Sequence, residues 1–182
     1  GAASVAITRA CACAAADRSV LLVEANLGRP ATHRVLGLDE DPGMADVLAG
    51  ETTLQDAVQQ ADTPNLSILT VGSSENRVYE RLSGRAMGQL LEEASKAYDL
   101  VLIDTAPAIV SGDAVAIANR CDASMLVVKA LSEKRGMVAR LRSELDQSRS
   151  MFLGVLVNAV RPAAGGYLKR NIRVAHQDQA SS

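Results

Sequence analysis

A run of four apolar residues, Leu100 to Ile103, ends in Asp104 and is followed closely by Pro107. A short apolar run between polar residues is typical of a strand buried on both faces of a parallel sheet. In open α/β sheets, ligands bind at the carboxyl ends of such strands. Asp104 is therefore a candidate to hold a metal ion or a metal-bound water. A simple turn-capping role would explain a single aspartate at this position about equally well.

A second short apolar run, Val20 to Val23, repeats this pattern, because Glu24 and then Asn26 follow it. Apolar runs and amphipathic spacing predict three further strands and a set of helices. The predicted strands are 66–71, 124–128 and 153–157, and the predicted helices are 2–16, 44–49, 79–97, 114–119 and 133–148, with a short one capped by Thr52 or Thr53. Strands that alternate with helices predict an α/β fold with a mostly parallel sheet, helices on both faces and right-handed crossovers.

Composition narrows the class of protein. Hydrophobic residues make up 48% of the 182 residues but aromatic residues only 2%, so the core must consist of Ala, Val, Leu and Ile. A formal net charge of -2 gives no basic excess for binding nucleic acid. No apolar run approaches the roughly 20 residues of a membrane helix, and no secretory signal is recognisable. We read Cys11, Cys13 and Cys121 as buried thiols in a reducing cytoplasm.

Two segments carry a family resemblance. Residues 21–30, LLVEANLGRP, and residues 98–107, YDLVLIDTAP, resemble the Walker A-prime and Walker B segments of the bacterial tyrosine kinases (BY-kinases). The connecting segments 42–51, 66–72, 81–87 and 153–158 are similar to those of the same family, in the same order. The resemblance runs from Gly1 to about Val160. Any single segment would also fit the wider group of partition and septum-site ATPases.

The resemblance implies a cytoplasmic P-loop domain over residues 1–162 with a flexible tail over 163–182, and a first strand upstream of Gly1. In that family the domain uses ATP and Mg²⁺ to phosphorylate tyrosines near its C-terminus, where this chain has Tyr167. It regulates capsule or exopolysaccharide synthesis and export. Its partner is a membrane-anchored chain-length regulator or that regulator's cytoplasmic tail. The family also implies work at the inner face of the membrane, without insertion, and homo-oligomers.

The resemblance also implies roles for single residues. Glu24 and Asp104 would be catalytic, and both would bind the metal together with Asn26. Asn158 would contact the adenine base, since a side-chain amide both donates and accepts hydrogen bonds, and Arg161 would flank the ring. A backbone-satisfying role for Asn158 is nearly as good an explanation.

The phosphate-binding loop departs from the family. Counting back from Leu21, Gly1 falls on the final glycine of the loop, Ala2 on its lysine, Ala3 on the residue whose hydroxyl binds Mg²⁺, and Ser4 on the threonine that commonly follows. A methyl group supplies neither charge nor a metal ligand. Losing both groups is expected to cost several kcal/mol, on the order of thousands-fold in rate.

The Walker A-prime segment departs as well. Glu24 stands for the first aspartate, Asn26 for the second, and Gly28 for an arginine, although Arg29 is adjacent. Three readings follow. The first is a catalytically impaired kinase-like domain that acts as a regulator or scaffold. The second is an active kinase whose loop is compensated by Lys129, Arg161 or a neighbouring subunit. The third is a dimerising partition or septum-site ATPase, although residues 169–182 are too polar for the membrane helix common in that group.

One geometric expectation tests the site. If the register is right, Glu24, Asp104 and the beginning of the first helix near Ser4 converge at one end of the sheet, because strand ends and a helix N-terminus together suit anions and metals. If both carboxylates merely cap strand ends, no such convergence is needed.

Overall fold

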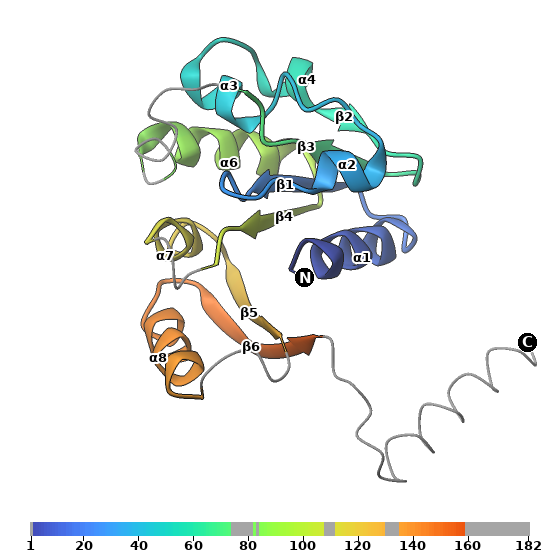
Figure 1. Cartoon of the computed structure of the whole chain (residues 1–182). Helices are drawn as coiled ribbons and strands as arrows, with labels where there is room; N and C mark the ends of the chain where they lie inside the picture. The colour runs from blue at the N-terminus through green and yellow to red at the C-terminus, as the bar shows by residue number, and fades with distance from the viewer. Residues whose placement is uncertain (1, 74–81, 83, 108–111, 130–134, 159–182) are drawn as a thin grey trace, which may run out of the picture.

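The computed structural model describes residues 2–73, 82, 84–107, 112–129 and 135–158 of the chain. Figure 1 shows strands and helices that alternate along the chain, as the sequence predicts. In order, the elements are α1 (Ala2–Ala14), β1 (Val20–Ala25), α2 (Thr32–Leu36), α3 (Met44–Ala49), α4 (Leu54–Ala57), β2 (Gln59–Gln60), β3 (Leu66–Leu69), α6 (Arg85–Ala97), β4 (Leu100–Thr105), α7 (Asp113–Ala118), β5 (Ala123–Lys129), α8 (Arg135–Asp146) and β6 (Met151–Asn158).

The main sheet has the strand order β2-β3-β1-β4. β1 pairs in parallel with β3 and with β4, and β2 adds a short antiparallel pair at the edge beside β3. In the β1–β4 pairing, Val20 lies opposite Leu100 and Glu24 opposite Asp104. The parallel arrangement predicted for these strands is therefore confirmed, and the two acidic residues end neighbouring strands.

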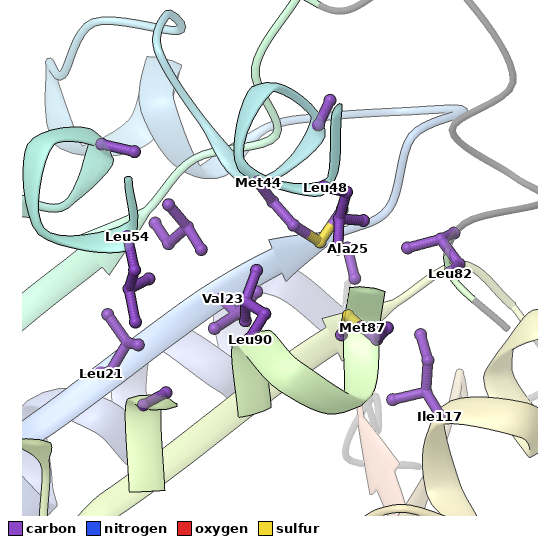
Figure 2. Close-up of a cluster of buried hydrophobic side chains, with 14 residues drawn as sticks. Leu21, Val23, Ala25, Met44, Leu48, Leu54, Leu82, Met87, Leu90 and Ile117 are labelled. Carbon is purple, nitrogen blue, oxygen red and sulfur yellow. The ribbon is translucent and has the colours of Figure 1, made fainter. Parts of the chain in front are cut away.

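Helices cover both faces of this sheet, so β1 is buried along its whole length. Its alternate residues face opposite layers. Leu21 and Val23 join a core cluster with α3, α4 and α6, to which Met44 and Met87 contribute (Figure 2). Val20 and Leu22 join a second cluster on the α1 face. Burying one such side chain contributes about 1.5–3 kcal/mol, so this central strand anchors both layers.

The first helix is built from the residues that favour helices most. α1 is rich in alanine, which loses no side-chain entropy on helix formation. Ala10 and Ala14 are buried, and their small side chains let the helix pack closely on β1 and β4. Asp17, with a φ of 58°, turns the chain from α1 into β1.

The structure differs from the predicted single sheet in one respect. Among the described residues, β5 and β6 form a separate two-stranded parallel sheet, with a register shift between Ser124 and Met125. No pairing joins β5 to β4 in the described part of the chain, so each has an edge without a strand neighbour there. The predicted flexible tail, residues 163–182, lies outside the described residues, as do residues 79–81 and 83 of the predicted 79–97 helix.

A candidate nucleotide site at the strand ends

The parallel register of β1 and β4 places Glu24 and Asp104 side by side. Neighbouring strands lie about 4.8 Å apart, so the two carboxylates are close. Both side chains are buried, with exposed fractions of 1% for Glu24 and 6% for Asp104. Two acidic groups thus lie close together where little solvent reaches them, which is a common feature of functional sites.

The environment raises the pKa of Asp104 to about 6. The main cause is burial, which disfavours the charged carboxylate, and the negative charge of Glu24 raises the pKa further. The Oδ2 atom of Asp104 is buried and has no hydrogen-bond partner among the described residues. A buried carboxylate oxygen without a partner is costly, so this atom marks a place suited to a cation, a water or a proton.

Glu24 has a structural task as well. Its Oε1 atom accepts hydrogen bonds from the backbone N–H groups of Ala31, at 2.6 Å, and Thr32, at 2.7 Å. These donors lie at the beginning of α2, where N–H groups lack partners within the helix. The carboxylate therefore ties the turn after β1 to the first residues of α2. Its Oε2 atom has no hydrogen-bond partner in the part of the chain that the structure describes.

His33 lies beside the Oε2 atom of the Glu24 carboxylate. Its Nδ1 atom is 3.7 Å from Oε2 of Glu24, and its Nε2 atom is 3.7 Å from Oε2 of Glu40. Nε2 also accepts a hydrogen bond of 3.2 Å from Nε of Arg34. At 3.7 Å both carboxylate contacts are too long for hydrogen bonds. Nδ1 is buried and has no hydrogen-bond partner among the described residues.

The first helix begins at the same end of the sheet. α1 packs on β1 and β4, and a short turn joins its last residue to the beginning of β1. It therefore runs antiparallel to β1, and its length of about 20 Å matches that of the strand. Figure 1 accordingly shows the N-terminal end of α1 on the side where β1 and β4 end. The helix begins at Ala2, so Ala2, Ala3 and Ser4 form its first turn.

The other predicted site residues are less closely associated. Asn26 opens the turn after β1, where its carbonyl accepts a hydrogen bond from the Arg29 backbone. Asn158 ends β6 in the second sheet, opposite Lys129. Gly1, Arg161 and Tyr167 lie outside the described residues.

The donor atoms present do not make the metal clamp that the family implies. Mg²⁺ prefers octahedral oxygen ligands, often one or two carboxylates with phosphate oxygens and waters. Within the described ranges, Glu24 and Asp104 each have a buried carboxylate oxygen without a hydrogen-bond partner, but Ala3 has no hydroxyl to offer. Across the described ranges, no group of three or more His, Cys, Asp or Glu side chains is placed to hold a metal ion.

The sequence analysis does not identify several residues that lie near Glu24. Thr32, His33 and Glu40 belong to or follow α2, a helix of five residues that is too short to show periodicity. Thr32 Oγ1 and His33 Nδ1 are buried without hydrogen-bond partners in the described structure. The one sequence signal for the end of α2 is Gly37, because glycine is common at the C-terminal end of a helix. Its left-handed φ of 67° ends α2 in this way.

A parallel sheet with two acidic strand ends and a helix beginning beside them is the arrangement of the P-loop class of nucleotide-binding domains. Known structures agree. The cell division ATPase MinD from Pyrococcus furiosus superposes with a TM-score of 0.76 at 21% identity, over 94% of this chain and 73% of that one, which supports the fold alone. No family model matches the sequence.

Bacterial tyrosine kinases are more similar in sequence. The kinase domain of the Escherichia coli tyrosine kinase ETK superposes with a TM-score of 0.82 at 29% identity, over 90% of this chain and 64% of that one. The tyrosine-protein kinase YwqD of Bacillus subtilis (strain 168) is 32% identical over 141 residues, or 78% of this chain and 60% of the relative. In both sequence and fold, the chain is therefore similar to the P-loop kinase domains of bacterial tyrosine kinases. It spans less than two thirds of the length of these curated relatives.

None of the helices in the described part of the chain has both the length and the apolar character needed to span a membrane.

Proposed function

We propose that this chain is a kinase-like domain of capsule or exopolysaccharide synthesis that has lost most of its phosphoryl-transfer capacity and acts as a regulator or scaffold. The observation that carries the proposal is the beginning of α1. Ala2 and Ala3 occupy its first turn, where the family places a lysine and a hydroxyl. Without them, neither phosphate charge nor Mg²⁺ is held where the chemistry needs them.

ATP with Mg²⁺ remains the ligand that the family implies, and its binding here is weak in this proposal. The first turn of α1 still presents backbone N–H groups, which suit phosphate. Asp104 and Glu24 supply the acidic groups, and Asn26 and Asn158 complete the proposed contacts. One oxygen of Glu24 is already used by Ala31 and Thr32, so this residue is a poor free base.

The proposed setting follows the family. The domain acts in the cytoplasm, at the inner face of the membrane, through a membrane-anchored chain-length regulator or its cytoplasmic tail, and as a homo-oligomer. Tyr167 is the candidate acceptor in a tail that is otherwise free of tyrosine. A scaffold role requires the fold and its surfaces rather than turnover, which suits a domain with a well-buried main sheet and a degenerate loop.

The test is to incubate the purified protein with Mg²⁺ and ATP and to follow phosphate release and phosphotyrosine. We expect neither above background, while the double variant Ala2→Lys with Ala3→Ser gains nucleotide affinity. The matched control introduces the same side chains at two exposed positions near the C-terminal end of α1, in the double variant Ala12→Lys with Ala15→Ser. We expect this control to gain no nucleotide affinity. Tyrosine labelling at the rate of an intact relative would overturn the impairment. Phosphate release without labelling would instead favour a switch ATPase.

A further inference from the structure

One oxygen of Glu24 serves as the cap of α2. Its Oε1 atom accepts hydrogen bonds of 2.6 Å from the backbone N–H of Ala31 and of 2.7 Å from that of Thr32. Ala31 is the N-cap residue of α2, and its methyl side chain makes no capping hydrogen bond. A carboxylate that accepts from N–H groups at the beginning of a helix forms strong, charge-assisted hydrogen bonds. Glu24, from β1, therefore replaces the cap that α2 lacks locally.

The length of the glutamate side chain makes this capping contact possible. An aspartate at position 24 would hold its carboxylate nearer to the strand by one carbon–carbon bond, about 1.5 Å. Both hydrogen bonds to α2 would then lengthen to about 4 Å unless the helix moved, and a contact of that length is not a hydrogen bond. The residue that ends β1 thus has the length that the contact with α2 requires.

The other oxygen of Glu24 lies beside an imidazole ring. His33 Nδ1 is 3.7 Å from Oε2, and both side chains are buried, with exposed fractions of 7% for His33 and 1% for Glu24. Mg²⁺ prefers octahedral oxygen ligands and usually keeps several of its waters. A buried carboxylate oxygen next to an imidazole nitrogen is a poor place for such a hydrated ion.

Asp104 is the second carboxylate of the pair. Its Oδ2 atom is buried and has no hydrogen-bond partner among the described residues. The described ranges bring no third His, Cys, Asp or Glu side chain to a position where the group could hold a metal ion. With Glu24 engaged by α2, one buried carboxylate is left, which is a weak ligand set for Mg²⁺.

We propose that the acidic ends of β1 and β4 bind no Mg²⁺, because Glu24 serves instead as the capping group that holds α2 to β1. The inference goes beyond the proposed function, since it rests on the contacts of Glu24 and uses neither Ala2 nor Ala3. It implies that repair of the phosphate-binding loop alone does not restore a metal site.

Thermal unfolding of the full chain with Mg²⁺ alone tests the absence of a metal site. A site with a dissociation constant of about 1 mM would, at about 10 mM Mg²⁺, raise the ratio of folded to unfolded protein about elevenfold and the melting temperature by roughly 3–6 °C. We expect the melting temperature to stay within about 1 °C of its value in NaCl of equal ionic strength. A rise of about 3 °C or more that Asp104→Asn abolishes would overturn the proposal.

Two substitutions of Glu24 separate capping from metal binding. Glu24→Gln keeps an oxygen within reach of α2 but loses the charge, whereas Glu24→Asp keeps the charge but is too short. We expect Glu24→Asp to lower the midpoint of urea unfolding, measured with Mg²⁺ present, at least about twice as far as Glu24→Gln. Glu51→Asp, at an exposed glutamate, is the matched control and should leave the midpoint unchanged. An equal or smaller loss for Glu24→Asp than for Glu24→Gln would overturn the capping role.

A third measurement uses the repaired loop and rests on the proposed function. In the double variant Ala2→Lys with Ala3→Ser, the dissociation constant for ADP should change by less than about twofold when Mg²⁺ is added. Tightening by about tenfold or more would overturn this inference and leave the proposed role of the loop intact. If the double variant bound no ADP, the register assumed for the loop would be wrong, and the first two measurements would still decide the role of Glu24.

Discussion

At the scale of single residues, the pair Glu24 and Asp104 sets the electrostatics of the site. Asp104 has a pKa of about 6 in the folded protein, above its ordinary value of 3.8. The folded state therefore holds this proton more tightly than the unfolded chain does. Its contribution to stability is fully present below about pH 4, falls as the pH rises toward 6, and stays lost above that. The loss amounts to about 3 kcal/mol at most.

Asp104→Asn should consequently stabilise the domain at neutral pH, because the amide has the shape of the carboxylic acid and never ionises. We expect the variant to unfold at a higher temperature than the wild type at pH 7.5, with the difference shrinking toward pH 4. Thermal unfolding followed by circular dichroism at a series of pH values measures this. A difference that is independent of pH would mean that Asp104 is already ionised freely in the folded state.

Glu24 gives a second prediction at this scale, since its Oε1 atom serves two backbone donors. Glu24→Ala leaves the N–H groups of Ala31 and Thr32 without that acceptor and should cost about 2–4 kcal/mol. Glu24→Gln keeps an oxygen in the same place and should cost less than half as much. Urea unfolding of the two variants gives both values. Equal losses would show that the charge, and not the hydrogen bonding, is what the fold requires.

At the scale of elements, the sequence predicts the secondary structure of those segments whose structure is determined by their own residues. The apolar runs give β1, β3 and β4, and Asp41-Pro42-Gly43 marks the turn before α3. α2 is not predictable in this way, because its beginning is bound by the side chain of Glu24 from another element. The same reasoning applies to the site. Glu24 and Asp104 are visible as strand ends, but His33 approaches Glu24 only because the chain turns from β1 into α2.

The contact between α3 and the end of β3 yields a prediction for glycine. A Cβ atom on Gly43 would clash with the backbone nitrogen of Gly72 and would lie 2.6 Å from the carbonyl oxygen of Thr70. Both are main-chain atoms that cannot move aside easily, and the N–H of Met44 also donates to the carbonyl of Thr70. Gly43→Ala should therefore displace α3 and cost about 1–3 kcal/mol.

The matched control is Gly28→Ala, because a Cβ atom there would meet nothing within 4 Å. We expect its free energy of unfolding to stay within about 0.5 kcal/mol of the wild type. Chemical unfolding of the two variants side by side makes the comparison. If Gly43→Ala were equally harmless, the close approach of α3 to the end of β3 would not exist in solution.

At the scale of the whole molecule, the two sheets differ in how well they are covered. Every residue of β1 and β3 is buried, whereas no residue of β5 or β6 is. α7 still links the second sheet to the main core, because Ile117 belongs to the large cluster of Figure 2 and the Arg120 side chain donates to the carbonyl of Gly84. Among the described residues, the main sheet is thus well buried and the β5–β6 sheet is weakly covered, and α7 with the residues that follow it contacts the main core.

This asymmetry predicts two classes of stability within one chain. Opening a region costs less where fewer apolar contacts break, so β5 and β6 should open without unfolding the main sheet. In native-state hydrogen exchange, we expect the amides of β1 and β3 to exchange only through global unfolding. The free energy of opening measured for these amides should therefore fall as denaturant is added. The amides paired between β5 and β6 should exchange at least a hundredfold faster and with little dependence on low denaturant. Uniform protection across both sheets would mean that the β5–β6 pair unfolds together with the main core.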